Sequence, residues 1–324
     1  MAAAGGVPVT GRMSVEDIPI SAQDREKIKE KIKDEIESFI KSNCDKKSEG
    51  LSHYLCEFDN QQKKATNAYL LNSEFFKNAQ ILGEGSYGDV YDCGFWTIES
   101  KTGENKNIDI VVKTQKLADD ETGPDPLYEA YINFVLINMI IMENPDIGLV
   151  PTFGLFYCGR KDGMFCVDKD GNKINENNSI FILQEKKNAE PLSVVRKFTK
   201  EMLIELFKIL VKLEENGIYH CDINDGNILV DETNNNKIYL IDFGLASFMI
   251  NGESIYQSDC DQSDCDQSDC ATDFLSICIL LVEYNRDLYD KYDLYDKIKE
   301  FKNPHKPRKT IYESVLEDLE EYEP

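Results

Sequence analysis

The chain has 324 residues, of which 41% are hydrophobic and 30% charged, and its formal net charge is -24 at pH 7. This length suits two lobes or one large domain with an extension, and the hydrophobic content excludes wholesale disorder. So acidic a chain repels nucleic-acid phosphates and anionic membrane surfaces. We therefore expect neither nucleic acid nor membrane as a partner. A basic protein substrate would suit the negative electrostatic field of the chain better.

Ten cysteines occur without a CxxC pair, which indicates a reducing compartment. The N-terminal residues (MAAAGGVPVTGRMS) lack the apolar core of a signal peptide. The longest apolar runs, at residues 131–142 and 274–282, are too short to span a bilayer. We therefore expect a cytoplasmic protein.

The first predicted element is an amphipathic helix at residues 24–41 (DREKIKEKIKDEIESFIK). Its apolar side chains recur at helical spacing and form one face: Ile28, Ile32, Ile36, Phe39 and Ile40. We expect this face to pack on the rest of the chain rather than on a membrane or a partner. We assign residues 1–78 to an N-terminal extension.

Strands are predicted next, followed mainly by helices. Residues 79–112 alternate β-branched and aromatic side chains around glycines, which predicts hairpins. A helix is predicted at 127–142, and strands at 149–158 and 179–185 are separated by a polar hairpin turn, DKDGN, at 168–172. After residue 191 the pattern is mainly helical, most clearly at 198–216. Strands first and helices afterwards predict an α+β fold.

Two segments of biased amino-acid composition say less about function. Residues 257–270 (QSDCDQSDCDQSDC) repeat acids and thiols that could bind a soft metal, and Ser258 and Ser263 could be phosphorylated. The composition favours a solvated loop expansion instead. The basic run KNPHKPRK at 302–309 is interpreted as a solvated face or linker.

Residues 82–90 (LGEGSYGDV) have the spacing G-x-G-x-x-G-x-V. Glycines let a backbone hairpin approach phosphate oxygens and donate N–H groups to them. Dinucleotide-binding folds share this spacing, but there a helix begins at the last glycine, whereas here a strand-like VYDCGFW follows. The candidate nucleotide-binding residues of this hairpin are Leu82, Gly83, Glu84, Gly85, Ser86, Tyr87, Gly88, Asp89 and Val90.

The next predicted strand, IDIVVK, ends on Lys113. A lysine there can reach the α- and β-phosphates of a nucleotide, and Glu129 in LYEAYINF is the candidate carboxylate that would hold it. A lysine at a strand end is otherwise common on protein surfaces. Its place after the glycine hairpin favours the catalytic interpretation.

The strongest motif is YHCDINDGNILV at 219–230. Asp222 can accept the proton of an incoming hydroxyl, and Asn227 can bind magnesium. A second block, YLIDFGLA at 239–246, supplies Asp242 for a metal that bridges the β- and γ-phosphates. Four such motifs in one order are hard to obtain by chance.

With these motifs the chain resembles the eukaryotic-type protein-kinase superfamily over about residues 79–283. The resemblance implies a bilobal fold, with a small β-rich N-lobe at 79–187 and a shortened helical C-lobe at 188–324 that is truncated after helix F. It also implies ATP and Mg2+ as cofactors. The implied roles are phosphate anchor for Lys113, its helix partner for Glu129, catalytic base for Asp222, and metal ligands for Asn227 and Asp242.

The resemblance extends to two further segments. Gln184 and Glu185 in FILQEKK fit the passage from strand to hinge, where adenine usually meets the backbone, so Glu185 is a further candidate nucleotide-binding residue. Residues 273–283 (DFLSICILLVE) resemble helix F, and Asp273 matches the aspartate that braces the catalytic loop.

The departures concern control and the acceptor. Cys221 replaces the usual arginine before the base, so control through a phosphorylated activation loop is not expected. Asn224 replaces the lysine of serine/threonine kinases, and no A-P-E triplet occurs between Asp242 and Asp273, where the DQSDC repeat lies. These changes describe a minimal, divergent C-lobe, like those of atypical and large-DNA-virus kinases.

The leading hypothesis is a serine/threonine protein kinase that uses Mg-ATP. A small-molecule kinase of the aminoglycoside or choline type is a second, because its H-x-D-x-x-x-G-N loop matches Gly226 and Asn227. A pseudokinase that binds nucleotide or partners without turnover is a third. The changed peptide-binding segment argues for it, whereas four retained residues argue against it: Lys113, Asp222, Asn227 and Asp242.

Overall fold

The computed structural model describes residues 80–85, 88–99, 105–116, 126–158, 166–167, 173–174, 179–250, 253–255, 271–294, 296–297 and 308–321. All of them belong to one compact unit, Ile36–Pro324. The helix predicted at 24–41, the polar turn at 168–172 and the repeat at 257–270 lie outside the described residues. So do Ser86 and Tyr87 of the glycine motif, and most of the basic run at 302–309.

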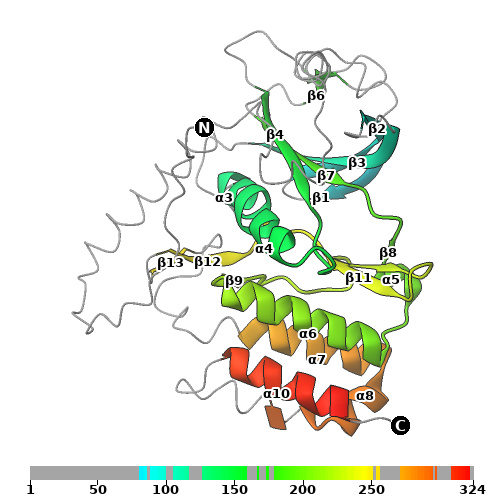
Figure 1. The fold of residues 1–324 in the computed structure, drawn as a ribbon, viewed down its shortest axis with the longest axis vertical. Helices are drawn as coiled ribbons and strands as arrows, with labels where there is room; N and C mark the ends of the chain where they lie inside the picture. Colours follow the sequence, from blue (N-terminus) through cyan, green and yellow to red (C-terminus); the bar gives the residue numbers. More distant parts are fainter. Residues whose placement is uncertain are drawn as a thin grey trace. The chain divides into compact units, whose positions relative to one another are not determined.

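A five-stranded antiparallel sheet forms the first part of the fold (Figure 1). Its strands, in spatial order, are β1 (Gln80–Gly85), β2 (Gly88–Glu99), β3 (Asn105–Lys116), β7 (Ser179–Glu185) and β4 (Thr152–Cys158). β5 (Cys166–Val167) pairs antiparallel with β6 (Lys173–Ile174) on either side of the predicted turn, as a hairpin requires. The predicted hairpins and both later strands are therefore present.

A helical stretch packs against this sheet. It runs through α3 (Pro126–Tyr131), a π-helical segment η2 (Ile132–Ile137) and α4 (Asn138–Glu143), in agreement with the helix predicted at 127–142. Buried Asn138 fixes it to β4, because its Nδ2 donates to the carbonyl oxygen of Thr152 (2.8 Å) and its Oδ1 accepts from the N–H of Thr152 (3.0 Å). π-helical turns within helices are rare and occur often at functional sites.

The second part of the fold is mainly helical. Its helices are α5 (Leu192–Val195), α6 (Lys200–Glu215), α7 (Ala271–Tyr284), α8 (Arg286–Lys291) and α10 (Arg308–Glu321). Thr199 caps α6 by accepting the N–H of Met202 (3.3 Å). Buried Phe207 of α6 packs on Phe274 of α7 and Tyr312 of α10, with ring centroids 5.9 and 5.8 Å away. One aromatic cluster thus joins three helices.

Short strands connect these helices and carry the loops of the site. They are β8 (Glu190–Pro191), β9 (Ile218–Tyr219), β10 (Ile228–Asp231), β11 (Lys237–Leu240), β12 (Ser247–Ile250) and β13 (Glu253–Ile255). They form two three-stranded sheets with the orders β11-β10-β8 and β13-β12-β9. The loop between β9 and β10 and the loop between β11 and β12 therefore lie close to each other.

The predicted α+β class is confirmed, with an antiparallel sheet first and helices afterwards. α7 matches the segment predicted as helix F, and α8 and α10 follow it. The domain bounds 1–78, 79–187 and 188–324 remain predictions. No helix among the described residues combines the length and the apolar character needed to cross a bilayer.

Candidate functional site

The glycine motif forms a β-hairpin at one edge of the large sheet. β1 pairs with β2 up to Gly85 and Gly88, and the register shifts between Ile81 and Gly83. Because a strand rather than a helix follows the last glycine, the dinucleotide-binding alternative does not apply. Leu82 lies at this register shift, and its exposed fraction is 53%.

The last glycine of the motif lies very close to β3. A Cβ atom built on Gly88 would approach the carbonyl oxygen of Thr114 to 1.8 Å. The Thr114 hydroxyl in turn donates to the carbonyl oxygen of Asp89 (3.3 Å). Position 88 therefore requires glycine for the approach of the two strands, not only for a ligand.

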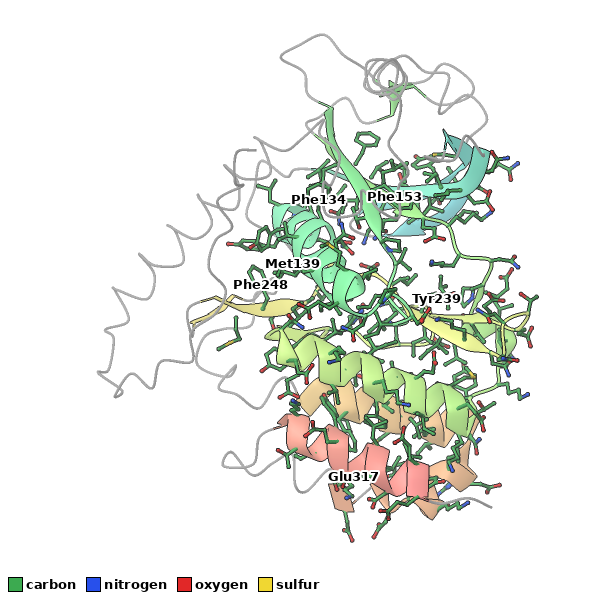
Figure 2. The ribbon with its side chains drawn as sticks, viewed as in Figure 1. Phe134, Met139, Phe153, Tyr239, Phe248 and Glu317 are labelled. Atoms are coloured by element: carbon green, nitrogen blue, oxygen red, sulfur yellow. The ribbon has the colours of Figure 1, made fainter. Side chains whose placement is uncertain are left out.

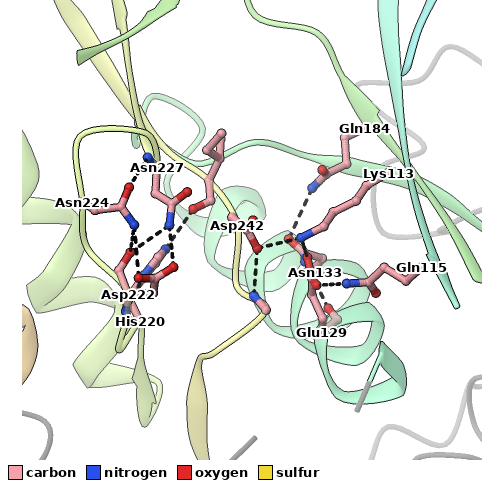
Figure 3. Close-up of polar contacts among 12 residues, drawn as sticks. Lys113, Gln115, Glu129, Asn133, Gln184, His220, Asp222, Asn224, Asn227 and Asp242 are labelled. Atoms are coloured by element: carbon pink, nitrogen blue, oxygen red, sulfur yellow. Dashed lines mark hydrogen bonds and ion pairs between the residues drawn. The ribbon is translucent and has the colours of Figure 1, made fainter. Parts of the chain in front are cut away.

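Lys113, Glu129 and Asp242 come together from β3, α3 and the loop after β11 (Figure 3). Lys113 Nζ lies 2.8 Å from Glu129 Oε1 and 2.7 Å from Asp242 Oδ1. The side chain of Glu129 is 2% exposed, whereas that of Asp242 is 41% exposed. One lysine thus bridges a buried carboxylate and a partly exposed one.

The charges of this group shift one another. Burial opposes the charged form of Lys113, but the Glu129 and Asp242 carboxylates outweigh it and hold the lysine pKa above its usual value. Burial raises the pKa of Asp242, yet the neighbouring Lys113 and the N–H of Gly244 bring it below its usual value. Burial dominates at Glu129 and raises its pKa despite Lys113. The two ion pairs of Lys113 are therefore strongest in the pH range in which Lys113, Glu129 and Asp242 are all charged.

The motif YHCDINDGNILV at 219–230 forms the loop between β9 and β10 and holds Asp222 on both oxygens. Asn227 Nδ2 donates to Asp222 Oδ2 (2.9 Å) and to its carbonyl oxygen (2.8 Å). Asn224 Nδ2 donates to Asp222 Oδ1 (3.1 Å), while Asn224 Oδ1 accepts the N–H groups of Gly226 (2.9 Å) and Asn227 (3.1 Å). Asn224 thus occupies the lysine position as an internal brace of the loop.

Buried His220 connects this loop to the one that carries Asp242. Its Nε2–H donates to the carbonyl oxygen of Ile241 (2.9 Å), and its Nδ1 then accepts the N–H of Asp222 (3.3 Å). Ile241 also donates its N–H to the carbonyl oxygen of Asn227 (3.0 Å). These bonds hold the loop that carries Asp222 and Asn227 beside the loop that carries Asp242.

Helix α7 supports the loop from beneath. Buried Asp273 accepts the N–H of His220 (3.0 Å) and the N–H of Cys221 (2.8 Å), as the predicted brace requires. Cys221 has φ 61° and Asp242 has φ 63°, which are left-handed conformations that non-glycine residues rarely adopt. Such strain persists where surrounding contacts impose it, and functional sites often show it.

The predicted hinge follows β7. The N–H of Glu185 donates to the carbonyl oxygen of Pro151 (3.2 Å), and the Glu185 carboxylate pairs with Lys187 Nζ (2.7 Å). Gln184 turns toward the helix, and its Nε2 donates to Asn133 Oδ1 (3.3 Å) and Thr152 Oγ1 (3.2 Å). Within the described residues, Glu185 makes no hydrogen bond or ion pair to Lys113, Glu129 or Asp242, so its predicted role depends on its position alone.

The residues predicted to bind Mg2+ offer suitable oxygen atoms. Within the described residues, Asn227 Oδ1 and Asp242 Oδ2 accept no hydrogen bond, and hard oxygen donors suit Mg2+. The described part of the chain contains no group of three or more His, Cys, Asp or Glu side chains arranged for a metal ion. Mg2+ usually takes only one or two protein carboxylates and completes its shell with water and phosphate, so the pair fits it.

Three supporting residues were not predicted from the sequence. Gln115 contacts Glu129, Asn133 Nδ2 donates to the carbonyl oxygen of Glu129 (3.1 Å), and the Tyr284 hydroxyl donates to Asp225 Oδ2 (2.6 Å). Each lies at a periodic spacing from a predicted residue, on a strand or a helix. This spacing is the sequence feature that places each of them on the same face as a predicted residue.

Comparisons with known proteins agree with this arrangement. Residues 170–255 match the ABC1 atypical kinase-like domain family. The chain is 43% identical over 53 residues to the B1 kinase of vaccinia virus (strain Copenhagen), and 23% identical over 181 residues to the serine/threonine-protein kinase dkf-1 of Caenorhabditis elegans. It is also 25% identical over 191 residues to the melanoma receptor tyrosine-protein kinase of Xiphophorus maculatus.

These matches cover limited parts of the proteins compared. They span 16% of this chain and 18% of the B1 kinase, 52% of this chain and 21% of dkf-1, and 59% of this chain and 14% of the receptor kinase. The chain therefore matches about a fifth or less of the length of each of these relatives. The kinase motifs, the fold and these matches together support a divergent protein-kinase-like protein that is similar to viral kinases over part of its length.

Proposed function

We propose that this chain is an ATP-dependent protein kinase that transfers the γ-phosphate of Mg-ATP to a serine or threonine hydroxyl of a protein in the cytoplasm. The observation that carries the proposal is the position of Lys113 Nζ, 2.8 Å from Glu129 and 2.7 Å from Asp242. This arrangement holds a cation beside Asp242, one of the two residues proposed to bind the metal. Positioning and electrostatic stabilisation are what phosphoryl transfer requires.

The nucleotide would lie between the glycine hairpin and the loops of the helical part. Backbone N–H groups of the hairpin, from Leu82 to Val90, would approach the phosphates, and Lys113 would bind the α- and β-phosphates. Glu129 keeps the lysine in place, and the backbone around Glu185 would meet the adenine. These roles follow from position in the fold.

Asp222 would act as the base that orients the acceptor hydroxyl and takes its proton. Each of its carboxylate oxygens accepts one amide N–H, from Asn224 or Asn227, which fixes the carboxylate plane. A carboxylate oxygen has a second lone pair, so either oxygen can still accept a hydroxyl proton. Asn227 and Asp242 would hold Mg2+, which when bound supplies positive charge to the phosphate oxygens.

A serine/threonine acceptor is supported by dkf-1, which is described as a serine/threonine-protein kinase. The receptor kinase of Xiphophorus is described as a tyrosine-protein kinase, so the acceptor must be tested directly. The acidic charge of the chain, -24, favours a basic protein. One observation favours a small-molecule acceptor instead: Asn224 braces the loop at the position where serine/threonine kinases place lysine.

The test is transfer of labelled phosphate from Mg-ATP to a panel of basic and acidic proteins, with phosphoamino-acid analysis of the product. Asp222→Asn keeps the shape of the base and removes its charge, and we expect it to lower the rate about 100- to 10,000-fold. Asp290→Asn is the matched control, because Asp290 lies on α8 with its side chain 65% exposed.

The outcomes separate the three hypotheses. Label on serine or threonine that is lost in Asp222→Asn supports the proposal, and label on tyrosine corrects the acceptor. Transfer confined to small hydroxylated molecules, such as an aminoglycoside or choline, supports the second hypothesis. ATP binding without transfer to any acceptor would contradict the proposed activity and support a pseudokinase.

A further inference from the structure

Gln115 binds the same carboxylate as Lys113, from the same strand. Lys113 Nζ contacts Glu129 Oε1, and Gln115 Nε2 donates to Glu129 Oε2. The two residues are two positions apart on β3, so their side chains lie on one face of the sheet. A single strand thus provides a donor for each oxygen of the helix carboxylate, as Figure 3 shows.

The environment of Gln115 does not favour a polar side chain for stability alone. Gln115 is 2% exposed, and its Oε1 is buried without a hydrogen-bond partner. A buried carbonyl oxygen without a donor opposes folding, because it loses its bonds to water. An apolar side chain of equal length would avoid that loss, so the contact with Glu129 is the feature that accounts for glutamine here.

The sheet holds Gln115 rigidly. It pairs with Gly88 of β2 on one side and with Ile180 of β7 on the other. A Cβ atom on Gly88 would lie 3.2 Å from Gln115 Cγ, which shows how closely the glycine hairpin covers this side chain. Side chains on strands in a packed sheet interior have few alternative rotamers, so the amide is fixed in space.

Helix α3 has other attachments, but they hold different parts of it. Gln184, through Asn133, binds the backbone carbonyl of Glu129. Phe248 of β12, labelled in Figure 2, packs on Tyr128 and Tyr131 with ring centroids 6.0 and 5.7 Å away. These contacts hold the backbone and the aromatic side chains of the helix, whereas Gln115 and Lys113 hold its Glu129 carboxylate and so tie α3 to β3.

We propose that Gln115 is a positioning residue that orients Glu129 toward Lys113, so that the lysine is aligned by the sheet without a bound partner or a modified activation segment. The inference rests on the proposed function, in which Lys113 binds the phosphates. It agrees with Cys221 at the position where kinases controlled by a phosphorylated loop have arginine. The effect of Gln115 on the reaction is indirect, because it acts through Glu129.

The test uses the full chain and two substitutions of equal length. Gln115→Met keeps the volume and removes the donor, and we expect kcat to fall about 10-fold with the KM for ATP changed less than about threefold, because one bond to a charged group is lost. Gln115→Glu places a second carboxylate against Glu129, so kcat should fall further. Gln80→Met, an exposed position in β1, is the matched control and should keep the wild-type rate.

A second readout needs no turnover. Hydrogen exchange measured by mass spectrometry without nucleotide should be about 10-fold faster over α3 (Pro126–Tyr131) in Gln115→Met, and unchanged over α6 (Lys200–Glu215). The melting temperature should stay close to that of the wild type, since the orphan oxygen is removed together with the bond. A parallel loss of melting temperature and rate would indicate a purely structural role and overturn the proposal.

Wild-type kcat together with wild-type exchange over α3 in Gln115→Met would also overturn it. If the wild-type chain transfers no phosphate to any acceptor, the proposed function fails. The exchange measurement still decides whether Gln115 holds the helix. The two failures are therefore distinguishable.

Discussion

Asp273→Ala removes the carboxylate that joins α7 to the catalytic loop. The side chain is 2% exposed and accepts two backbone N–H groups, from His220 (3.0 Å) and Cys221 (2.8 Å). A buried donor left without an acceptor costs about 1–3 kcal/mol. The two together predict a loss of about 2–6 kcal/mol in the free energy of unfolding, if the loop keeps its shape.

The loop can reduce that loss by relaxing. Cys221 is held at φ 61°, a conformation that costs about 1–3 kcal/mol and that the carboxylate helps to impose. If the brace is removed, the residue can return to an ordinary conformation, and part of the lost stability is recovered. Relaxation displaces Asp222, the next residue, and a shift of about 1 Å at such a residue can lower a rate about 100-fold.

We therefore expect the loss of stability to fall toward 2 kcal/mol, at the lower end of about 2–6 kcal/mol, with kcat reduced about 100-fold or more. Urea unfolding measures the first quantity and phosphate transfer the second. Asp290→Ala on α8 is the matched control, and its exposed side chain predicts a change within about 0.5 kcal/mol and no change in rate. Wild-type stability and rate in Asp273→Ala would refute the bracing role.

Two further predictions concern the glycine hairpin and the C-terminal end of α7. Gly88→Ala would place a Cβ 1.8 Å from the carbonyl oxygen of Thr114, so strand pairing should weaken and ATP affinity should fall at least about 10-fold by calorimetry. Gly83→Ala, which meets no atom within 4 Å, should keep the wild-type melting temperature, and equal destabilisation by both changes would contradict the steric argument. The hydrogen bond to Asp225 raises the pKa of Tyr284 to about 12. Any free energy of unfolding that this bond contributes is therefore fully present below about pH 10, and it is lost as the pH rises toward 12. In Asp225→Asn the Tyr284 resonance, assigned in tyrosine-labelled protein, should titrate nearer pH 10, and an unchanged titration would exclude the bond.

The order of elements and the central residues of the site could be predicted from the sequence because each has a distinctive chemical requirement. The approach of β2 to β3 requires Gly88, and the following strand supplies Lys113 at a fixed distance along the chain. Asp222 and Asp242 lie in short motifs whose residue types match those that proton transfer and metal binding require. Local spacing therefore carries most of this information.

The supporting contacts could not be predicted with the same certainty, because glutamine, asparagine and tyrosine serve many purposes. Gln115 follows Lys113 by two residues on a strand, and Asn133 follows Glu129 by four residues on a helix. Each lies on the same face as its partner, yet the partner of a polar side chain depends on how strand and helix pack. Only the fold shows that these faces meet.

Helix α7 binds the catalytic loop at two points that are three turns apart on one face. Asp273, near its start, holds the N–H groups of His220 and Cys221, and Tyr284, at its end, binds Asp225. These contacts lie on either side of Asp222 in the sequence. Both contacts come from α7 itself, so one helix fixes the backbone on both sides of Asp222, the residue proposed as the base.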